Sequence, residues 1–201
     1  MRATPNDPRI AIGTGCHRLH PETVCTDRLV LVPMSVDLVR SILRKDWLTA
    51  KRLLGTEFPR EWREDGWRWL EPQADEGEHD DRFVVWGTRL AFATAADDVD
   101  EGRGAVVAEV GFHGPPDTDG WVEIGYRVVA SRQREGLAEE AARALLTWAG
   151  VAGVSGVKAS VSPHNAASIG LLRKLGFIDA GCYEHESLGK QLVFRRRALA
   201  R

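Results

Sequence analysis

The chain has 201 residues, of which 43% are hydrophobic and 28% charged, and its formal net charge is −2 at pH 7. This composition is typical of a folded globular chain, so extensive disorder is not expected. The charge excludes a strongly basic surface, which nucleic acids or an anionic membrane would require. No apolar run is long enough to cross a bilayer. We therefore expect neither a nucleic-acid partner nor a membrane partner.

The N-terminal segment, residues 1–25, carries three prolines and shows little periodicity. We interpret it as an extended arm that precedes a single domain over 26–199. Its candidate metal ligands are Cys16, His17, His20 and Cys25. Their spacing matches no standard zinc site, so we predict no metal. The small, odd number of cysteines and the lack of a signal-peptide pattern favour a cytoplasmic location.

Hydrophobic periodicity and turn residues divide the rest of the chain into strands and helices. We expect strands over 26–33, 82–92, 105–112, 121–129, 157–161, 177–184 and 190–196. We expect helices over 35–44, 46–54, 61–74 and 137–150, and a short one after Pro163 that ends at Gly176. Acidic loops over 73–81 and 95–104 should be solvated.

The connections between these elements predict how the strands pair. The hairpin loop over 114–120 makes the strands 105–112 and 121–129 antiparallel. The strand 121–129 reaches 157–161 through a helix, and such crossovers join parallel, adjacent strands. The predicted fold class is therefore α/β (α+β), a single domain with a mixed sheet and helices on both faces.

The stretch 121–150 is predicted to form a strand, a tight loop and a helix that begins near Leu137. Gly136 in the loop can adopt backbone angles that other residues avoid. The first N–H groups of a helix have no intrahelical acceptor and attract anions, and Arg132 and Arg134 add positive charge. The stretch therefore suits a diphosphate, although an ordinary strand–helix connection has the same outline. It contains neither a Walker loop nor a dinucleotide fingerprint.

A second motif, GVKASVSPHNAASIGLLRKLGF, occupies residues 156–177. Together with the loop Gln133-x-x-Gly136-x-Ala138, it resembles the GNAT superfamily of acyl-CoA-dependent N-acyltransferases. The superfamily loop is Gln/Arg-x-x-Gly-x-Gly/Ala, and its second signature is an Asn followed by a helix that closes in Leu-Gly-Phe. The spacing from Asn165 to Ser168 is similar to the RimJ/RimL-like subgroup of ribosomal-protein N-terminal acetyltransferases. The resemblance spans about 26–199 and implies a mostly antiparallel GNAT-type sheet.

This resemblance implies acetyl-CoA as the co-substrate. Backbone groups from Val128 onward should pair with the pantetheine arm as an added strand, and the loop N–H groups should hold the diphosphate. The implied cofactor-binding residues are Val128, Gln133, Arg134, Glu135, Gly136, Leu137, Ala138 and Asn165. Arg134 stands where many relatives have glycine. The family rule of direct transfer requires no nucleophilic cysteine.

Acyl transfer from a thioester to an amine requires a group that removes a proton from the amine. Glu123 matches the position where several GNAT enzymes have a catalytic glutamate, so it is the candidate base; a strand glutamate can also simply pair with a neighbour. Leu172 occupies the place where many members have an acidic tyrosine. Ser168 is the candidate acid by resemblance to the subgroup, while helix capping by Ser168 and proton donation by solvent remain alternatives.

The predicted function is N-acetyl transfer from acetyl-CoA to a primary amine, either a protein or peptide N-terminus or a small molecule. The alternative is a non-catalytic acyl-CoA sensor on the same fold. A homodimer would fit the family. The three tryptophans of the segment 61–74 could form walls of the acceptor pocket or pack in the core; they are Trp62, Trp67 and Trp69.

Overall fold

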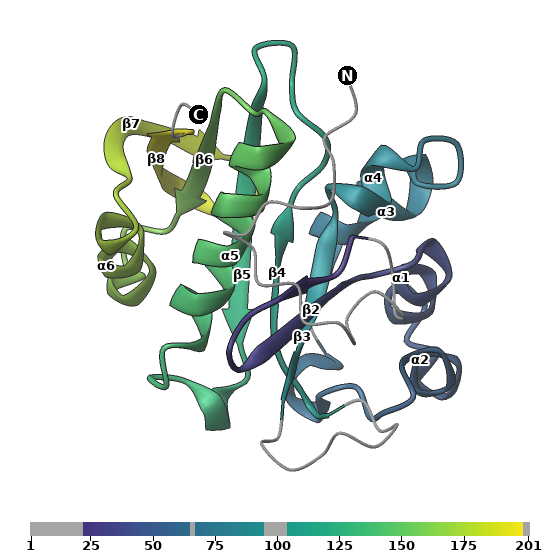
Figure 1. The fold of residues 1–201 in the computed structure, drawn as a ribbon. Coiled ribbons are helices and arrows are strands. Elements are labelled where there is room, and N and C mark those ends of the chain that lie inside the picture. Colours follow the sequence, from purple (N-terminus) through teal and green to yellow (C-terminus); the bar gives the residue numbers. More distant parts are fainter. Residues whose placement is uncertain (1–21, 65–66, 95–103, 199–201) are drawn as a thin grey trace.

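A computed structural model describes residues 22–64, 67–94 and 104–198 (Figure 1). Within them, eight strands form one sheet in the order β1-β2-β3-β4-β5-β6-β8-β7. The strands are β1 Val24–Cys25, β2 Leu29–Pro33, β3 Thr88–Ala93, β4 Val106–Phe112, β5 Trp121–Val128, β6 Gly156–Val161, β7 Ile178–His185 and β8 Gly189–Arg197. The pair β5–β6 is parallel and the other neighbours are antiparallel, which confirms the predicted mixed, mostly antiparallel sheet.

Helices and single 3₁₀ turns cover both faces of this sheet. The α-helices are α1 Val36–Leu43, α2 Trp47–Leu54, α3 Glu71–Glu76, α4 Arg82–Val85, α5 Leu137–Ala152 and α6 Ala166–Lys174. The 3₁₀ turns are η2 Arg60–Trp62, η3 Arg68–Leu70 and η4 Ala130–Arg132. Figure 1 shows α5 crossing the sheet, with α1 to α4 to its right and α6 with β6, β7 and β8 to its left.

The two faces can be assigned from aromatic contacts. Trp148 of α5 stacks on Phe112 of β4 with ring centroids 6.2 Å apart, so α5 covers the face to which Phe112 points. Arg127 of β5 lies on the opposite face, where its guanidinium contacts the rings of Trp62 and Trp67 at 4.4 and 4.5 Å. Because side chains alternate between faces along a strand, β5 presents one set of residues to α5 and another to the tryptophans.

The predicted helices near the N-terminus are confirmed, with their caps. The Ser35 hydroxyl accepts from the Leu38 N–H at the start of α1. Asp46 accepts from the Thr49 N–H at the start of α2, and Gly55 ends that helix with a φ of 73°. These caps satisfy backbone groups that a helix end leaves without partners, which is why short-range sequence signals located them well.

Two predicted elements are wrong in part. The helix expected over 61–74 is replaced by separate pieces, η2, η3 and α3. Trp67 has a φ of 48°, which no residue inside an α-helix adopts, and Pro72 lies in the first turn of α3, where proline is tolerated. The strand expected over 82–92 begins only at Thr88, because 82–85 form α4.

The turn between α4 and β3 depends on tertiary contacts that no local sequence pattern predicts. Gln73, expected in a solvated loop, is buried in α3. Its side chain donates to the Met34 carbonyl at 2.7 Å and accepts from the Thr88 N–H at 3.0 Å. These bonds attach α3 to the end of β2 and the start of β3.

The predicted boundaries elsewhere agree within a few residues. Val24 and Cys25, the end of the expected arm, form β1 and pair with β2. Residues 1–21, the acidic loop over 95–103 and residue 199 lie outside the described residues.

Candidate functional site

Strands β5 and β6 separate partway along their length. They pair in parallel from Trp121 with Gly156 to Glu123 with Lys158, and beyond that point β5 pairs with β4 while β6 pairs with β8. From Ile124 to Val128, the edge of β5 that faces β6 is therefore not part of a strand ladder. An extended molecule with amide groups could add to this edge as a short strand would.

The loop after β5 ends at an open helix N-terminus. Gly136 has a φ of 81° and is the N-terminal cap residue of α5, and no side chain caps this end. A Cβ at Gly136 would meet only the Arg28 guanidinium, at 3.6 Å, an ordinary contact distance to a flexible side chain. Leu137 is buried and Ala138 half-buried, and the N–H groups of this first turn point out of the helix end.

The charges around this loop differ from the expected pattern. Arg132 forms an ion pair with Glu135 at 2.9 Å, so part of its charge is compensated within the loop. Arg134 is exposed and has a φ of 67°, an angle that glycine adopts without cost. Since Arg134 stands where many relatives have glycine, the position keeps the backbone conformation that glycine would favour.

Arg28, which sequence reasoning missed, supports the loop from a distant segment. Its guanidinium donates to the Glu135 carbonyl at 3.0 Å and to the Glu140 carboxylate at 2.7 Å. Burial opposes the ionisation of Glu140, but hydrogen bonds from Thr26 and Arg28 outweigh it and hold the pKa of Glu140 below its usual value. The loop is thus fixed to the turn between β1 and β2.

Two other predicted cofactor residues make local hydrogen bonds. The Gln133 side chain donates to the Val128 carbonyl at 3.3 Å, which connects the loop to the end of β5. Asn165 is the N-cap of α6, and its side chain accepts from the Ser168 N–H at 3.0 Å. Asn165 is exposed and Ser168 half-buried, so both are accessible at the mouth of the split.

Tyr126 connects the two sides of this split. Its hydroxyl donates to the Ser168 carbonyl in the first turn of α6, at 3.4 Å, a long hydrogen bond. Burial raises the pKa of Tyr126, so the phenol keeps its proton at neutral pH. Leu172, at the position where many relatives have tyrosine, is buried in the core. Tyr126 therefore supplies a hydroxyl beside α6 that a helix-based motif search did not identify.

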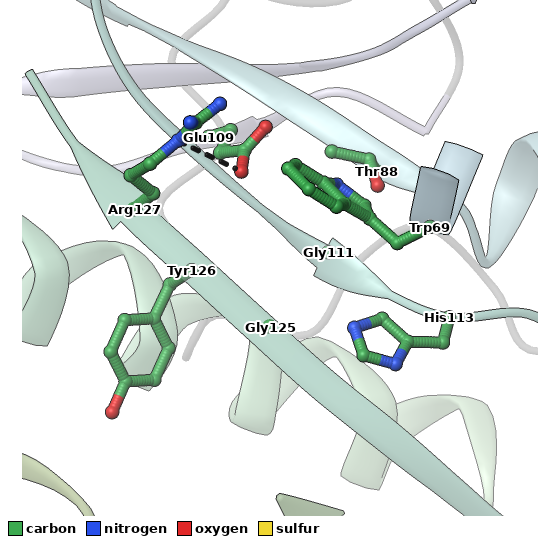
Figure 2. Close-up of a pocket in the computed structure, with 8 residues that line it drawn as sticks. All are labelled: Trp69, Thr88, Glu109, Gly111, His113, Gly125, Tyr126 and Arg127. Atoms are coloured by element: carbon green, nitrogen blue, oxygen red, sulfur yellow. Dashed lines mark ion pairs between the residues drawn. The ribbon is translucent and has the colours of Figure 1, made fainter. Parts of the chain in front are cut away.

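A pocket of about 250 Å³ opens on the face of β5 that carries Arg127, opposite the face that carries the Tyr126 side chain. Its lining residues come from η3 and three strands, and Figure 2 shows the Tyr126 side chain on the other side of β5 from Trp69 and His113. The lining residues are Trp69, Thr88, Glu109, Gly111, His113, Gly125, Tyr126 and Arg127. Trp69 is 38% exposed and forms a wall, whereas Trp62 and Trp67 are buried in the core. Core packing, one of the two alternatives for these tryptophans, therefore holds for Trp62 and Trp67, whereas Trp69 lines a pocket.

Two cross-strand pairs and His113 make up the floor of this pocket. Gly111 pairs with Gly125 in the middle, where the absence of side chains leaves a depression. At one end, Arg127 forms an ion pair with Glu109 at 3.3 Å, drawn as a dashed line in Figure 2. At the other end, the His113 N–H donates to the Glu123 carbonyl at 2.9 Å, so this histidine lies opposite the predicted base.

Comparison with known proteins agrees with this geometry. The family model described as "Acetyltransferase (GNAT) domain" matches residues 28–178. An uncharacterized N-acetyltransferase of Bacillus subtilis (strain 168), YjdG, is 40% identical over 74 residues, which are 36% of this chain and 44% of that protein. The match with this curated relative thus spans less than half of its length.

Solved structures share the fold at low sequence identity. One is an acetyltransferase from Salmonella typhimurium that modifies the N-terminal serine of ribosomal protein L7/L12, with a TM-score of 0.56 and 14% identity over 86% of this chain and 96% of that one. Another is the microcin C7 self immunity acetyltransferase MccE, solved with acetyl-CoA and AMP, with a TM-score of 0.58 and 13% identity over 89% and 98%.

The mixed, mostly antiparallel sheet with its parallel pair β5–β6 agrees with a GNAT-type acyltransferase fold. The match over 28–178 gives the family: this protein belongs to the GNAT acetyltransferase domain family. Members of the family use acetyl-CoA as acetyl donor. The RimJ/RimL-like subgroup is only loosely matched, because the similarity to the ribosomal enzyme is one of fold.

The residues present fit this co-substrate. The uncapped N-terminus of α5 suits a diphosphate, and the unpaired edge of β5 suits the amide groups of a pantetheine arm. Among the described residues, no cluster of three or more histidines, cysteines or acidic residues could hold a metal ion. No helix in the same part of the chain is both long and apolar enough to span a membrane.

Proposed function

We propose that this protein is an N-acetyltransferase that transfers an acetyl group directly from acetyl-CoA to a primary amine. The observation that supports this proposal most is the position of Gly125 to Arg127. These residues line the pocket on one face of β5, while the strand edge they share borders the split from β6. An amine in the pocket and a thioester in the split would therefore meet at one strand.

In this proposal, acetyl-CoA brings the acetyl group as a thioester. The N–H groups of α5 and the loop bind the diphosphate, and backbone groups from Val128 onward bind the pantetheine arm. The predicted loop residues contribute mainly through the backbone; they are Gln133, Arg134, Glu135, Gly136, Leu137 and Ala138. Asn165 caps α6 and so fixes the helix beside the reacting end.

We assign Glu123 as the group that finally receives the proton of the amine, directly or through an intermediary. It lies on the pocket face of β5, one cross-strand pair away from the glycine floor. Ser168 is the proposed donor of a proton to the leaving thiolate, and the nearby Tyr126 hydroxyl is a second donor at the same place. A thiol has a pKa of about 8.5, so this second proton transfer is the less demanding one.

The acceptor class is a primary amine, either a protein or peptide N-terminus or a small molecule. Structures with similar TM-scores are described by different roles: the Salmonella enzyme modifies a ribosomal protein, whereas MccE is described as a self immunity acetyltransferase. One fold hosts many substrates, so the choice must come from the pocket. The alternative is a non-catalytic sensor that binds acyl-CoA and needs no base.

Replacement of Glu123 distinguishes the two functions. We expect Glu123→Gln to lower turnover about 100-fold, because general base catalysis contributes about that much, while acetyl-CoA affinity stays unchanged. CoA release with a panel of peptides and small amines measures turnover, and calorimetry measures binding. Glu186→Gln, in an exposed turn, is the control. Acetyl-CoA binding by wild type without amine-dependent CoA release would support the sensor.

A further inference from the structure

The pocket contains a basic group that the motifs did not include, the imidazole of His113. This residue directly follows β4 and lines the pocket next to Gly125. Phe112 pairs with Ile124, and the His113 N–H donates to the Glu123 carbonyl, so His113 and Glu123 lie directly opposite each other. Side chains of directly opposed residues in an antiparallel pair point to the same face, with Cβ atoms about 5 Å apart.

The imidazole extends over the glycine floor. A Cβ placed on Gly125 would lie 2.8 Å from Nε2 of His113, so the histidine uses the space that a side chain at 125 would fill. Figure 2 shows the ring beside Gly125 and on the same side of β5 as Trp69. Gly125 also lies on the part of β5 that no longer pairs with β6. The imidazole is thus nearer than Glu123 to the place where an amine and a thioester would meet.

We propose that His113 is the group that takes the proton from the acceptor amine, and that Glu123 acts through His113 by accepting or stabilising that proton. This inference rests on the proposed acetyl transfer. As the amine nitrogen bonds to the carbonyl carbon of the thioester, its proton passes to the imidazole. The carbon–sulfur bond then breaks, and the sulfur takes a proton from a hydroxyl or from solvent. Glu123 then accepts the proton from His113 and releases it to solvent.

The charges around His113 keep it able to accept a proton. His113 lines the pocket and is exposed to solvent, but its neighbours remove part of its hydration. This partial desolvation lowers the pKa of His113, the Glu123 carboxylate opposes the effect, and the Lys158 ammonium adds to it. Lys158 of β6 is itself near Asp117 at 3.7 Å, and the Arg127–Glu109 pair occupies the far end of the pocket. The net lowering makes the imidazole neutral at pH 7, the form that can serve as a base.

The test compares His113→Gln, Glu123→Gln and the double variant in amine-dependent CoA release. If the two residues handle the same proton, each single change lowers kcat about 100-fold and the double variant is only slightly worse, because the effects of residues that act as a unit do not multiply. His79→Gln, an exposed histidine in the turn after α3, is the control and should match wild type.

A titration of the His113 ring by NMR gives a readout that does not depend on activity. Glu123→Gln removes the charge that raises the pKa of His113, so the midpoint should move to lower pH. Lys158→Met removes a charge that lowers it, so the midpoint should move to higher pH. In the Lys158→Met variant, the low-pH limb of the pH profile of kcat/KM should move to higher pH together with the titration midpoint of the His113 ring.

The outcomes separate this proposal from the proposed function. An active wild type with a His113→Gln variant that keeps kcat within twofold, and still binds acetyl-CoA, overturns the role of His113 alone. If the reductions in kcat caused by the two single changes multiply in the double variant, the two residues do not handle the same proton, and the proposed relay is overturned. A wild type that turns over none of the amines while binding acetyl-CoA overturns the proposed function itself.

Discussion

The proposed cofactor loop and the proposed acceptor pocket both adjoin strand β5, but they are built differently. The loop is nearly contiguous in sequence, from Val128 to Ala138, and offers mainly backbone N–H groups and one glycine. The pocket takes residues from η3, β3, β4 and β5, and offers mainly side chains. Recognition by the backbone tolerates sequence change, whereas recognition by side chains does not, so the same fold can keep its donor and change its acceptor.

The two regions are also connected, which limits how independently they can behave. The Glu61 carboxylate, next to the core residue Trp62 in η2, accepts from the Ala130 N–H at 2.6 Å at the start of the loop. Arg28 attaches the other end of the loop to the turn before β2. We expect changes in the pocket to affect acetyl-CoA binding only when they disturb one of these contacts.

The largest effect should come from Gly136→Trp, which places a large side chain at the N-terminus of α5 beside Arg28. We expect a loss of acetyl-CoA affinity on the order of 100-fold or more, since both the backbone angle and the diphosphate site are disturbed. Gly153→Trp is the matched control: it ends the same helix with a φ of 90° and has nothing within 4 Å of its Cβ position. Calorimetry that finds equal losses in both variants would contradict the assignment of the loop.

The next prediction compares the stability effects of replacing a core tryptophan, Trp67, and the pocket-lining Trp69. Trp67 is 1% exposed and donates its indole N–H to the Trp62 carbonyl, so Trp67→Ala should reduce the free energy of unfolding by about 3–5 kcal/mol. Trp69→Ala should cost less than about 1 kcal/mol and raise the KM for the amine instead. Urea unfolding and steady-state kinetics measure the two quantities; similar unfolding losses would show that Trp69 is also a core residue.

The smallest expected effect concerns the support of the loop by Arg28. Arg28→Ala should cost about 1 kcal/mol of stability at pH 7, because it removes charge-assisted hydrogen bonds to Glu140. The folded-state pKa of Glu140 is lowered, so this stabilisation is present above the unfolded pKa of about 4.3 and is lost as pH falls through the folded value.

Urea unfolding of wild type and Arg28→Ala at pH 7 and at pH 3 measures that dependence. The difference between the two proteins should shrink at the lower pH. Lys45→Ala, which breaks an exposed pair with Glu64, should change stability little at either pH. A difference for Arg28→Ala that grows with acidity would contradict the role of the Glu140 carboxylate.

Local signals predicted much of the fold. Ser35, Asp46 and Gly55 marked helix ends through contacts within four residues, and the alternation in β5 marked a strand half covered on each face. Prediction failed where distant residues decide the backbone. Trp67 adopts a positive φ inside an aromatic cluster, and Gln73 bridges β2 and β3 from a segment that looked like a solvated loop.

By itself, the sequence predicted the proposed donor side of this protein, because the glycine, the helix start and the capped second helix are short-range features that together resemble the GNAT motifs. Only the tertiary structure brought together the residues of the proposed acceptor side. It brought His113 opposite Glu123, placed the Gly111–Gly125 pair beneath them, and left Trp69 partly exposed while burying its neighbours. The physical reason is that cross-strand pairing and burial join residues far apart in the chain, and no local pattern records which ones will meet.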